Sequence, residues 1–130
     1  MTLRTLMLAT AILTFFFGLG FAVAPAQTLT LYGVTTDAVG LILGRFFGSA
    51  MLGYSILTWF ARDVDDPHSR RAIVLALFLS SVLAAVVAIW GQLAGLFNSF
   101  GWIGVIVFPL FAIAYGYFQF IKPVRVHSSS

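Results

Sequence analysis

The chain has 130 residues, of which 61% are hydrophobic and 8% are charged, and its formal net charge is +3. A soluble domain of this length needs far more polar surface, so the composition excludes a soluble globular protein. The sequence contains no cysteine, which excludes disulfides, iron–sulfur clusters and thiol catalysis. Most basic residues flank apolar segments, where Lys and Arg determine membrane topology, so the positive charge does not indicate nucleic-acid binding.

Four apolar segments occupy most of the chain, at residues 6–24, 39–61, 72–93 and 102–121. About 20 helical residues cross a hydrocarbon core that is about 30 Å thick. We therefore predict an all-α polytopic membrane protein, an antiparallel bundle of four transmembrane helices. Residues 1–127 are expected to form a single transmembrane domain, and residues 128–130 a tail or a cloning remnant. The first segment is longer than the core of a secretory signal, so we expect a retained anchor.

The basic residues outside the apolar segments lie in three places along the chain. They are found near the N-terminus, between the second and third segments, and after the fourth segment: Arg4, Arg62, Arg70, Arg71, Lys122 and Arg125. The other two loops, 25–38 and 94–101, carry none. Because basic loops remain in the cytoplasm, this pattern predicts that both termini and the middle loop are cytoplasmic.

Two aspartates stand where helices are expected to begin. Asp66 precedes Pro67, a pair typical of a helix start, and Asp37 precedes the second apolar segment. An alternative function for Asp66 is to bind a hard cation together with Asp63, Asp65 and His68. The run lacks the Gly and the distal Glu of a calcium loop and has arginines beside it, which favours capping and ion pairing. We expect no metal and no other cofactor.

Small residues follow one face of the second apolar segment, as Gly40, Gly44 and Gly48 recur every four residues. Such faces are the main association surfaces of helices in lipid. The third segment offers a matching series: Ser81, Ala84 or Ala85, Ala88, Gln92 and Gly95. We predict that these two helices pack closely along the two faces. A homodimer contact through the glycines is the alternative.

Arg45 is the only charged residue within the four apolar segments. It lies about 10 Å below the predicted outer surface, near the expected depth of Asp37, Gln92 and Asn98. These four residues could form a polar cluster with Asp37 as the counter-ion. In one interpretation Arg45 binds an anionic group such as a lipid phosphate or a carboxylate. In the other it reaches headgroups or local partners and only fixes helix register.

The apolar segments contain no Asp, Glu, Lys or His. A proton relay and bis-histidine haem ligation therefore lack their residues. No Ser-His-Asp triad or carboxylate pair can be assembled at one depth, so we expect no enzyme activity. The 14 phenylalanines could line a pocket for a planar lipid, although phenylalanine that faces lipid or another helix is the ordinary explanation.

Several stretches carry a resemblance to a known group of proteins. They are the run from Gly40 to Gly48, the boundary 59–62, the loop end 69–71, and residues 91–102. With these stretches the chain resembles small bacterial four-helix membrane proteins, similar in size and layout to the DoxX-like group. The resemblance implies a four-helix bundle in a bacterial inner membrane, and it supplies no catalytic residues.

Taken together, these features predict a non-enzymatic, multi-pass membrane protein that acts through helix packing and through contacts with lipids or a partner. We expect an accessory subunit of a larger membrane complex. The alternative is a small oligomeric transporter or channel, in which Arg45 selects an anionic or amphiphilic solute. The expected partners are membrane lipids and another membrane protein or a second copy of the chain.

Overall fold

A computed structural model of the chain describes residues 2–121, and all regular structure in this range is helical, without a strand. The helices are α1 (Leu3–Val23), α2 (Pro25–Leu31), α3 (Ala38–Ala61), α4 (Pro67–Leu93) and α5 (Trp102–Gly116), with the short turns η1 (Ser99–Gly101) and η2 (Tyr117–Ile121) on either side of α5. Four helical stretches are long and apolar enough to cross a membrane: Leu3–Val23, Ala38–Ala61, Pro67–Leu93 and Ser99–Ile121. The predicted all-α class and the four long apolar helices are confirmed. Lys122, Arg125 and the predicted tail lie outside the described residues.

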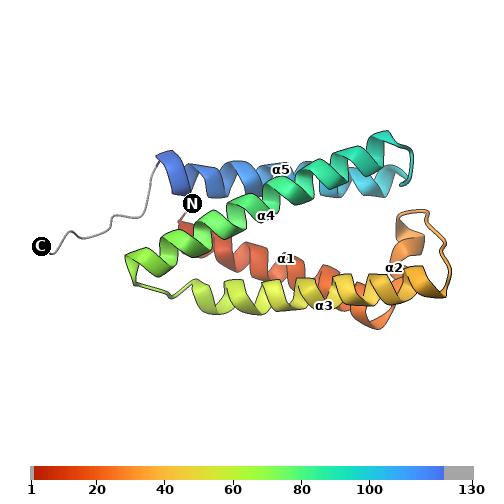
Figure 1. Cartoon of the computed structure of the whole chain (residues 1–130), viewed down its shortest axis with the longest axis horizontal. Coiled ribbons are helices and arrows are strands. Elements are labelled where there is room, and N and C mark those ends of the chain that lie inside the picture. The colour runs from red at the N-terminus through yellow and green to blue at the C-terminus, as the bar shows by residue number, and fades with distance from the viewer. Residues whose placement is uncertain (1, 122–130) are drawn as a thin grey trace, which may run out of the picture. The chain divides into compact units, whose positions relative to one another are not determined.

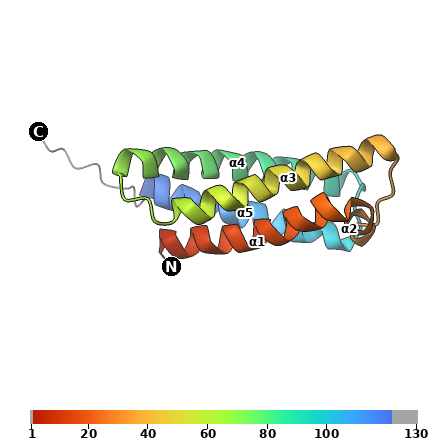
Figure 2. The same cartoon turned by 90° about the horizontal axis from the view of Figure 1, so that it is seen from below.

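The chain divides into two compact units, the first ending at Arg62 and the second beginning at Asp63. In the first unit α1 packs along α3, and the short helix α2 lies across one end of this pair (Figure 1). In the second unit α4 packs along α5 (Figure 2). Each unit is therefore a hairpin of two long helices.

In the first unit, small side chains form the middle of the contact between α1 and α3, and Phe21 packs edge-on against Phe47 toward one end. Ala11 faces Ser55, and Gly18 faces Gly48, so the two helices run antiparallel. The buried positions are mostly small or hydroxyl-bearing residues: Thr10, Ala11, Thr14 and Gly18 in α1, and Gly48, Ser55, Thr58 and Ala61 in α3. Small residues let helix backbones approach closely, which is how helices associate where lipid removes the hydrophobic drive between them.

The loop between α1 and α3 contains the short helix α2. Pro25 is its first residue, a position that proline favours because its missing N–H has no helical partner there. Pro25 is buried, and an added Cβ on Gly44 of α3 would lie 3.4 Å from it. Gly33, with φ of 73°, then turns the chain toward α3. The loop is thus folded over the end of the α1–α3 pair.

In the second unit, α4 begins at Pro67, five residues before the predicted apolar segment, because Asp66 caps its first turn. It ends in a Schellman motif, in which the Leu96 N–H donates to the Gly91 carbonyl and the Gly95 N–H to that of Gln92. Gly95 has φ of 75°, which only glycine adopts without strain. Gly95 therefore terminates α4.

The packing of α5 on α4 relies on an aromatic cluster near the end of α5. The Phe78 ring lies 2.9 Å from the position of a Cβ on Gly116, so any larger residue there would require the ring to shift. Phe78 also packs edge-on against Phe120, with ring centroids 5.3 Å apart. Tyr115 is completely buried. These contacts hold the last turn of α5 and η2 against α4.

Candidate functional site

Arg45 connects α3 to the end of α1. Its Nη1 donates a hydrogen bond of 2.8 Å to the carbonyl of Ala22. The last carbonyls of a helix lack intrahelical donors, and α1 is followed by Pro25, which has no N–H to offer. The guanidinium also complements the negative end of the helix dipole. Arg45 thus caps the C-terminus of α1, although its side chain remains exposed.

Asp37 acts as the N-cap of α3. Its Oδ1 accepts a 2.9 Å hydrogen bond from the Gly40 N–H, as the sequence predicted for this position. Both Asp37 and Arg45 lie within the described residues, and the structure shows no ion pair between them. They are eight residues apart, about 12 Å along the helix. The structure gives Asp37 a capping role and does not give it the expected role of counter-ion to Arg45.

Gln92 and Asn98 lie in the second unit and close the turn between α4 and η1. Gln92 Nε2 donates to the Asn98 carbonyl at 3.2 Å, and Asn98 Oδ1 accepts from the Phe100 N–H at 2.9 Å. Gln92 Oε1 is buried without a hydrogen-bond partner and occupies the space where a side chain on Gly101 would begin. Because these residues and Arg45 belong to different units, the four-residue cluster stays a prediction.

The glycine stripe of α3 has partners other than the predicted α4. A Cβ on Gly48 would meet the α1 backbone, at the N atom of Ala22 and 2.7 Å from the Gly18 carbonyl oxygen. Gly44 faces Pro25 of α2, and Gly40 faces the side chain of Thr36 in the preceding loop. Gly48 thus packs against α1, and the expected contact between this stripe and α4 stays a prediction.

The matching residues of α4 also have local partners. A Cβ on Gly104 of α5 would lie 3.7 Å from Ala88 Cβ, an ordinary contact within the second unit. A Cβ on Gly95 would meet no atom within 4 Å. Ala88 therefore packs toward α5. Gly95 terminates α4, and its predicted role in helix packing stays a prediction.

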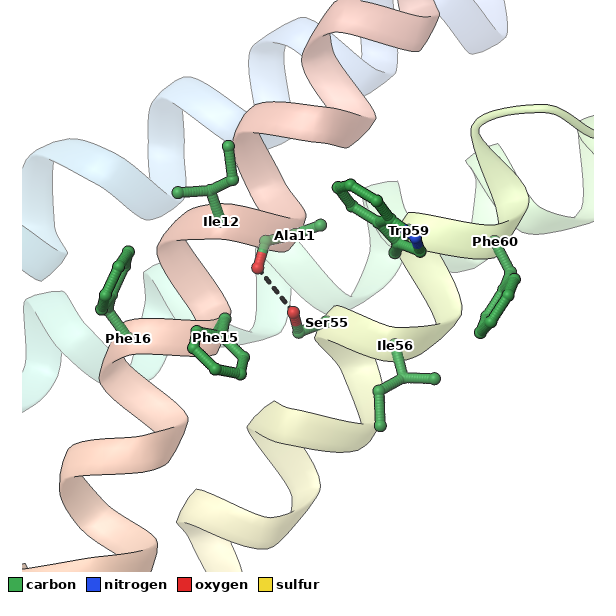
Figure 3. A pocket seen from close by; sticks show the side chains of 8 residues that line it. All are labelled: Ala11, Ile12, Phe15, Phe16, Ser55, Ile56, Trp59 and Phe60. Atoms are coloured by element: carbon green, nitrogen blue, oxygen red, sulfur yellow. Dashed lines mark hydrogen bonds between the residues drawn. The ribbon is translucent and has the colours of Figure 1, made fainter.

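A groove runs between α1 and α3 on one face of the first unit (Figure 3). Its volume is about 370 Å³. Large apolar side chains line it: Ile12, Phe15 and Phe16 from α1, and Ile56, Trp59 and Phe60 from α3. Ala11 and Ser55 also line it, and there the Ser55 hydroxyl donates to the Ala11 carbonyl at 2.5 Å. The only hydroxyl in the lining is thus engaged in the contact between the two helices.

A positive charge is held close to the groove. The guanidinium carbon of Arg62 lies 3.9 Å from the centre of the Trp59 ring, a cation–π contact. Arg62 Nη1 also donates to the Trp59 carbonyl. The pairs Ala11–Ser55 and Gly18–Gly48 share one antiparallel register, and this register places Arg4 level with Arg62. Both arginines therefore belong to the same end of the α1–α3 pair.

Sequence reasoning did not find this groove, although it named aromatic residues as possible pocket walls. The repeated aromatic pairs Phe15–Phe16 and Trp59–Phe60 are its only local signal. Their assembly into one groove depends on the register between α1 and α3, which the sequence does not display.

The acidic loop before α4 has a structural role at its last residue. Asp66 Oδ2 accepts hydrogen bonds from the Ser69 hydroxyl at 2.6 Å and from the Ser69 N–H at 3.3 Å. The hydroxyl bond, followed by the N–H bond, lowers the pKa of the Asp66 carboxyl. Within residues 2–121, no three His, Asp or Glu side chains come together as a metal site would require.

The chain was also compared with known proteins. A family model described as a domain of unknown function (DUF8292) matches residues 1–118. This match extends over both units, and the chain belongs to that family. No curated protein and no solved structure matches the chain.

Proposed function

We propose that this member of a family without an assigned function is a non-enzymatic integral membrane protein that acts through the outer surfaces of its helices. We further propose that it serves as an accessory subunit of a larger membrane complex. Its partners are then membrane lipids and at least one other membrane protein.

One observation carries this proposal: large apolar side chains point outward from every long helix. Representative exposed fractions are 66% for Phe16 in α1, 67% for Phe46 in α3, 68% for Leu83 in α4 and 70% for Ile113 in α5. In the first unit, small and hydroxyl-bearing residues form much of the contact between α1 and α3. This arrangement suits a lipid environment. Surfaces of this kind can make contacts only with lipid or with another apolar surface.

The use of the buried hydroxyls supports a non-enzymatic role. Thr14 Oγ1 donates to the Thr10 carbonyl at 2.7 Å, and Thr58 Oγ1 donates to the Tyr54 carbonyl at 2.9 Å. Hydroxyls in apolar helices often bond to the preceding turn in this way. A nucleophile would need a neighbouring base, and no ionisable side chain other than Arg45 and tyrosines lies in the four apolar segments.

The bacterial inner membrane is our proposed location, with both termini and the loop between α3 and α4 in the cytoplasm. The distribution of arginines supports this orientation. The resemblance to small bacterial four-helix membrane proteins supports the location. In this orientation α2 and the turn from α4 to η1 face outward.

The alternative, an oligomeric transporter that selects an anionic or amphiphilic solute through Arg45, is less well supported. Solute binding requires that the Arg45 guanidinium face a cavity. Arg45 instead donates to the Ala22 carbonyl at the end of α1. The bond to Ala22 supports the interpretation of Arg45 as a residue that fixes the helix contact.

The proposal is tested by purifying the tagged full chain from its native membranes in a mild detergent and identifying companions by mass spectrometry. We expect a membrane protein to be retained in a fixed ratio. The matched control is Gly48→Leu, which should separate α1 from α3 and lose the companion. A single monodisperse species without any protein companion would overturn the accessory-subunit proposal.

A further inference from the structure

We propose that the groove between α1 and α3 binds one acyl chain of an anionic phospholipid, whose phosphate lies at the end marked by Arg62. This inference rests on the proposed insertion of the chain in a membrane and names a ligand for one of its surfaces. Three properties of the groove carry it: its lining, its length and the charge at one end.

The lining suits a hydrocarbon chain. Six large apolar side chains form the walls, and all six are exposed, from 44% for Phe15 and Trp59 to 71% for Phe60. The groove is therefore open to the surroundings of the first unit. Its volume of about 370 Å³ falls in the range of small-ligand sites.

The length of the groove matches one leaflet of a bilayer. In the register set by Ala11 and Ser55, Phe60 lies level with Leu6 of α1. The lining therefore extends over the α1 levels from Leu6 to Phe16, about 15 Å at 1.5 Å per residue. A hydrocarbon core of about 30 Å consists of two leaflets of this thickness. One acyl chain, entering from the end of Phe60, would lie along the whole groove.

The charge at that end suits an anionic headgroup. Arg62 is two residues beyond Phe60 and is held over the Trp59 ring, and Arg4 belongs to the same end. Tryptophan favours the depth of the headgroups, and basic side chains at a membrane surface attract anionic lipids. Asp63 and Asp65 follow in the sequence and weaken the positive field. Because of this weakening, we expect Arg4 and Arg62 together to supply a net attraction close to that of one basic residue.

The test uses the full chain with Trp90→Phe and Trp102→Phe, so that Trp59 is the sole tryptophan. The protein is reconstituted in vesicles of unlabelled phosphatidylcholine that contain a small fraction of a lipid with brominated acyl chains, which quenches nearby tryptophan. The brominated lipid is either phosphatidylglycerol or phosphatidylcholine with identical chains. We expect phosphatidylglycerol to quench Trp59 at about fivefold lower mole fraction, the preference that one basic residue supplies near an anionic surface.

Two pairs of variants separate the charge from the groove. Arg4→Gln with Arg62→Gln should abolish the preference for phosphatidylglycerol, whereas Arg71→Gln, which removes a charge near the start of α4, should preserve it. Ile56→Phe fills the groove with a larger side chain that does not add a second tryptophan. It should reduce quenching of Trp59 by both lipids. Leu57→Phe is its control, because Leu57 is exposed and does not line the groove.

Equal quenching by the two lipids, or a preference that survives loss of both arginines, would overturn the proposal. If a second copy of the chain or a protein partner occupied the groove, a cross-linker placed at Phe60 would capture that protein. This result would also overturn the proposal. Carbonate extraction of the same vesicles distinguishes failure of the lipid site from failure of membrane insertion. A chain that stays in the membrane without lipid preference refutes only the lipid site. A chain that is extracted refutes membrane insertion and the lipid site together.

Discussion

Gly18 of α1 and Gly48 of α3 face each other backbone to backbone. A Cβ on Gly18 would lie 2.9 Å from the Gly48 carbonyl oxygen, and a Cβ on Gly48 would lie 2.7 Å from the Gly18 carbonyl oxygen. Neither position can accept even a methyl group unless one helix moves. The separation of α1 and α3 is therefore set by these two residues.

Gly48→Ala should lower the free energy of unfolding by at least about 1–3 kcal/mol, the usual cost of overpacking. The control is Gly53→Ala in the same helix, where an added Cβ meets no atom within 4 Å. This second change should raise stability by about 0.5–1 kcal/mol, because alanine favours a helix over glycine. Unfolding in detergent micelles measures both. Effects of the same sign would contradict the close contact.

Ser55→Ala removes a hydrogen bond that joins α3 to the middle of α1. We expect a loss of about 0.6 kcal/mol, and at most about 1.7 kcal/mol, which is the range measured for such bonds within membranes. Thr58→Val is the comparison, since Thr58 bonds only to carbonyls of its own helix, those of Tyr54 and Ser55, and its removal should cost less. The same unfolding assay ranks the two variants. A larger effect of Thr58→Val would contradict the bridging role of Ser55.

Arg45→Leu leaves the Ala22 carbonyl without the donor that α3 supplies. We expect stability to fall by about 1 kcal/mol, with faster amide exchange in the last turn of α1 and in α2. Arg45→Lys should restore part of the loss, because an ammonium donates one bond but lacks the guanidinium geometry. Normal stability of Arg45→Leu together with loss of a bound anionic solute would favour the transport alternative instead.

The N-terminus of α4 should depend on pH through Asp66. Its pKa is lowered in the folded chain by the hydrogen bonds from Ser69, so the cap contributes its full stability above the pKa of an unfolded aspartate. The contribution is lost as the pH falls through the lower, folded pKa. Hydrogen exchange at residues 67–71 should accelerate in that acidic window. In Asp66→Asn the same amides should show no such acid transition, whereas Asp65→Asn should keep it.

The orientation of the chain in the membrane can be measured by labelling cysteines introduced one at a time, because the sequence contains no cysteine. We expect Thr36→Cys, in the loop between α2 and α3, to react with a membrane-impermeant maleimide on intact cells. Asp65→Cys, in the loop between α3 and α4, should react only after permeabilisation. The reverse pattern would show that the basic loop faces outward and would contradict the proposed topology.

Hydropathy predicted the positions of the long helices well, because a span must be apolar over a fixed length. The predicted segment 39–61 differs from Ala38–Ala61 by one residue. For α4 two sequence signals were present, and the cap at Asp66 rather than the apolar boundary at residue 72 marks its start. A helix can continue into water past the apolar core when its first turn is capped.

Helix pairing was harder to predict, because small residues look alike on every helix. The stripe from Gly40 to Gly48 was matched to Ala88 and Gly95 of α4, which stays a prediction, whereas the contact of Gly48 with Gly18 of α1 was not foreseen. Arg45 posed a similar difficulty, since its partner is a backbone carbonyl and a backbone carbonyl has no sequence signature. The residues at caps were predictable because their partners are only two or three positions away.

The placement of small residues at helix contacts and large ones outside also reverses the usual pattern of mutational tolerance. Enlarging a residue by one methyl group at Gly18 or Gly48 should be more harmful than replacing an outward phenylalanine by leucine. In a saturation mutagenesis library of the first unit, the positions that tolerate the fewest substitutions should be those with the smallest side chains. The outward aromatic and aliphatic positions would exchange freely, except where they line the groove or meet a partner.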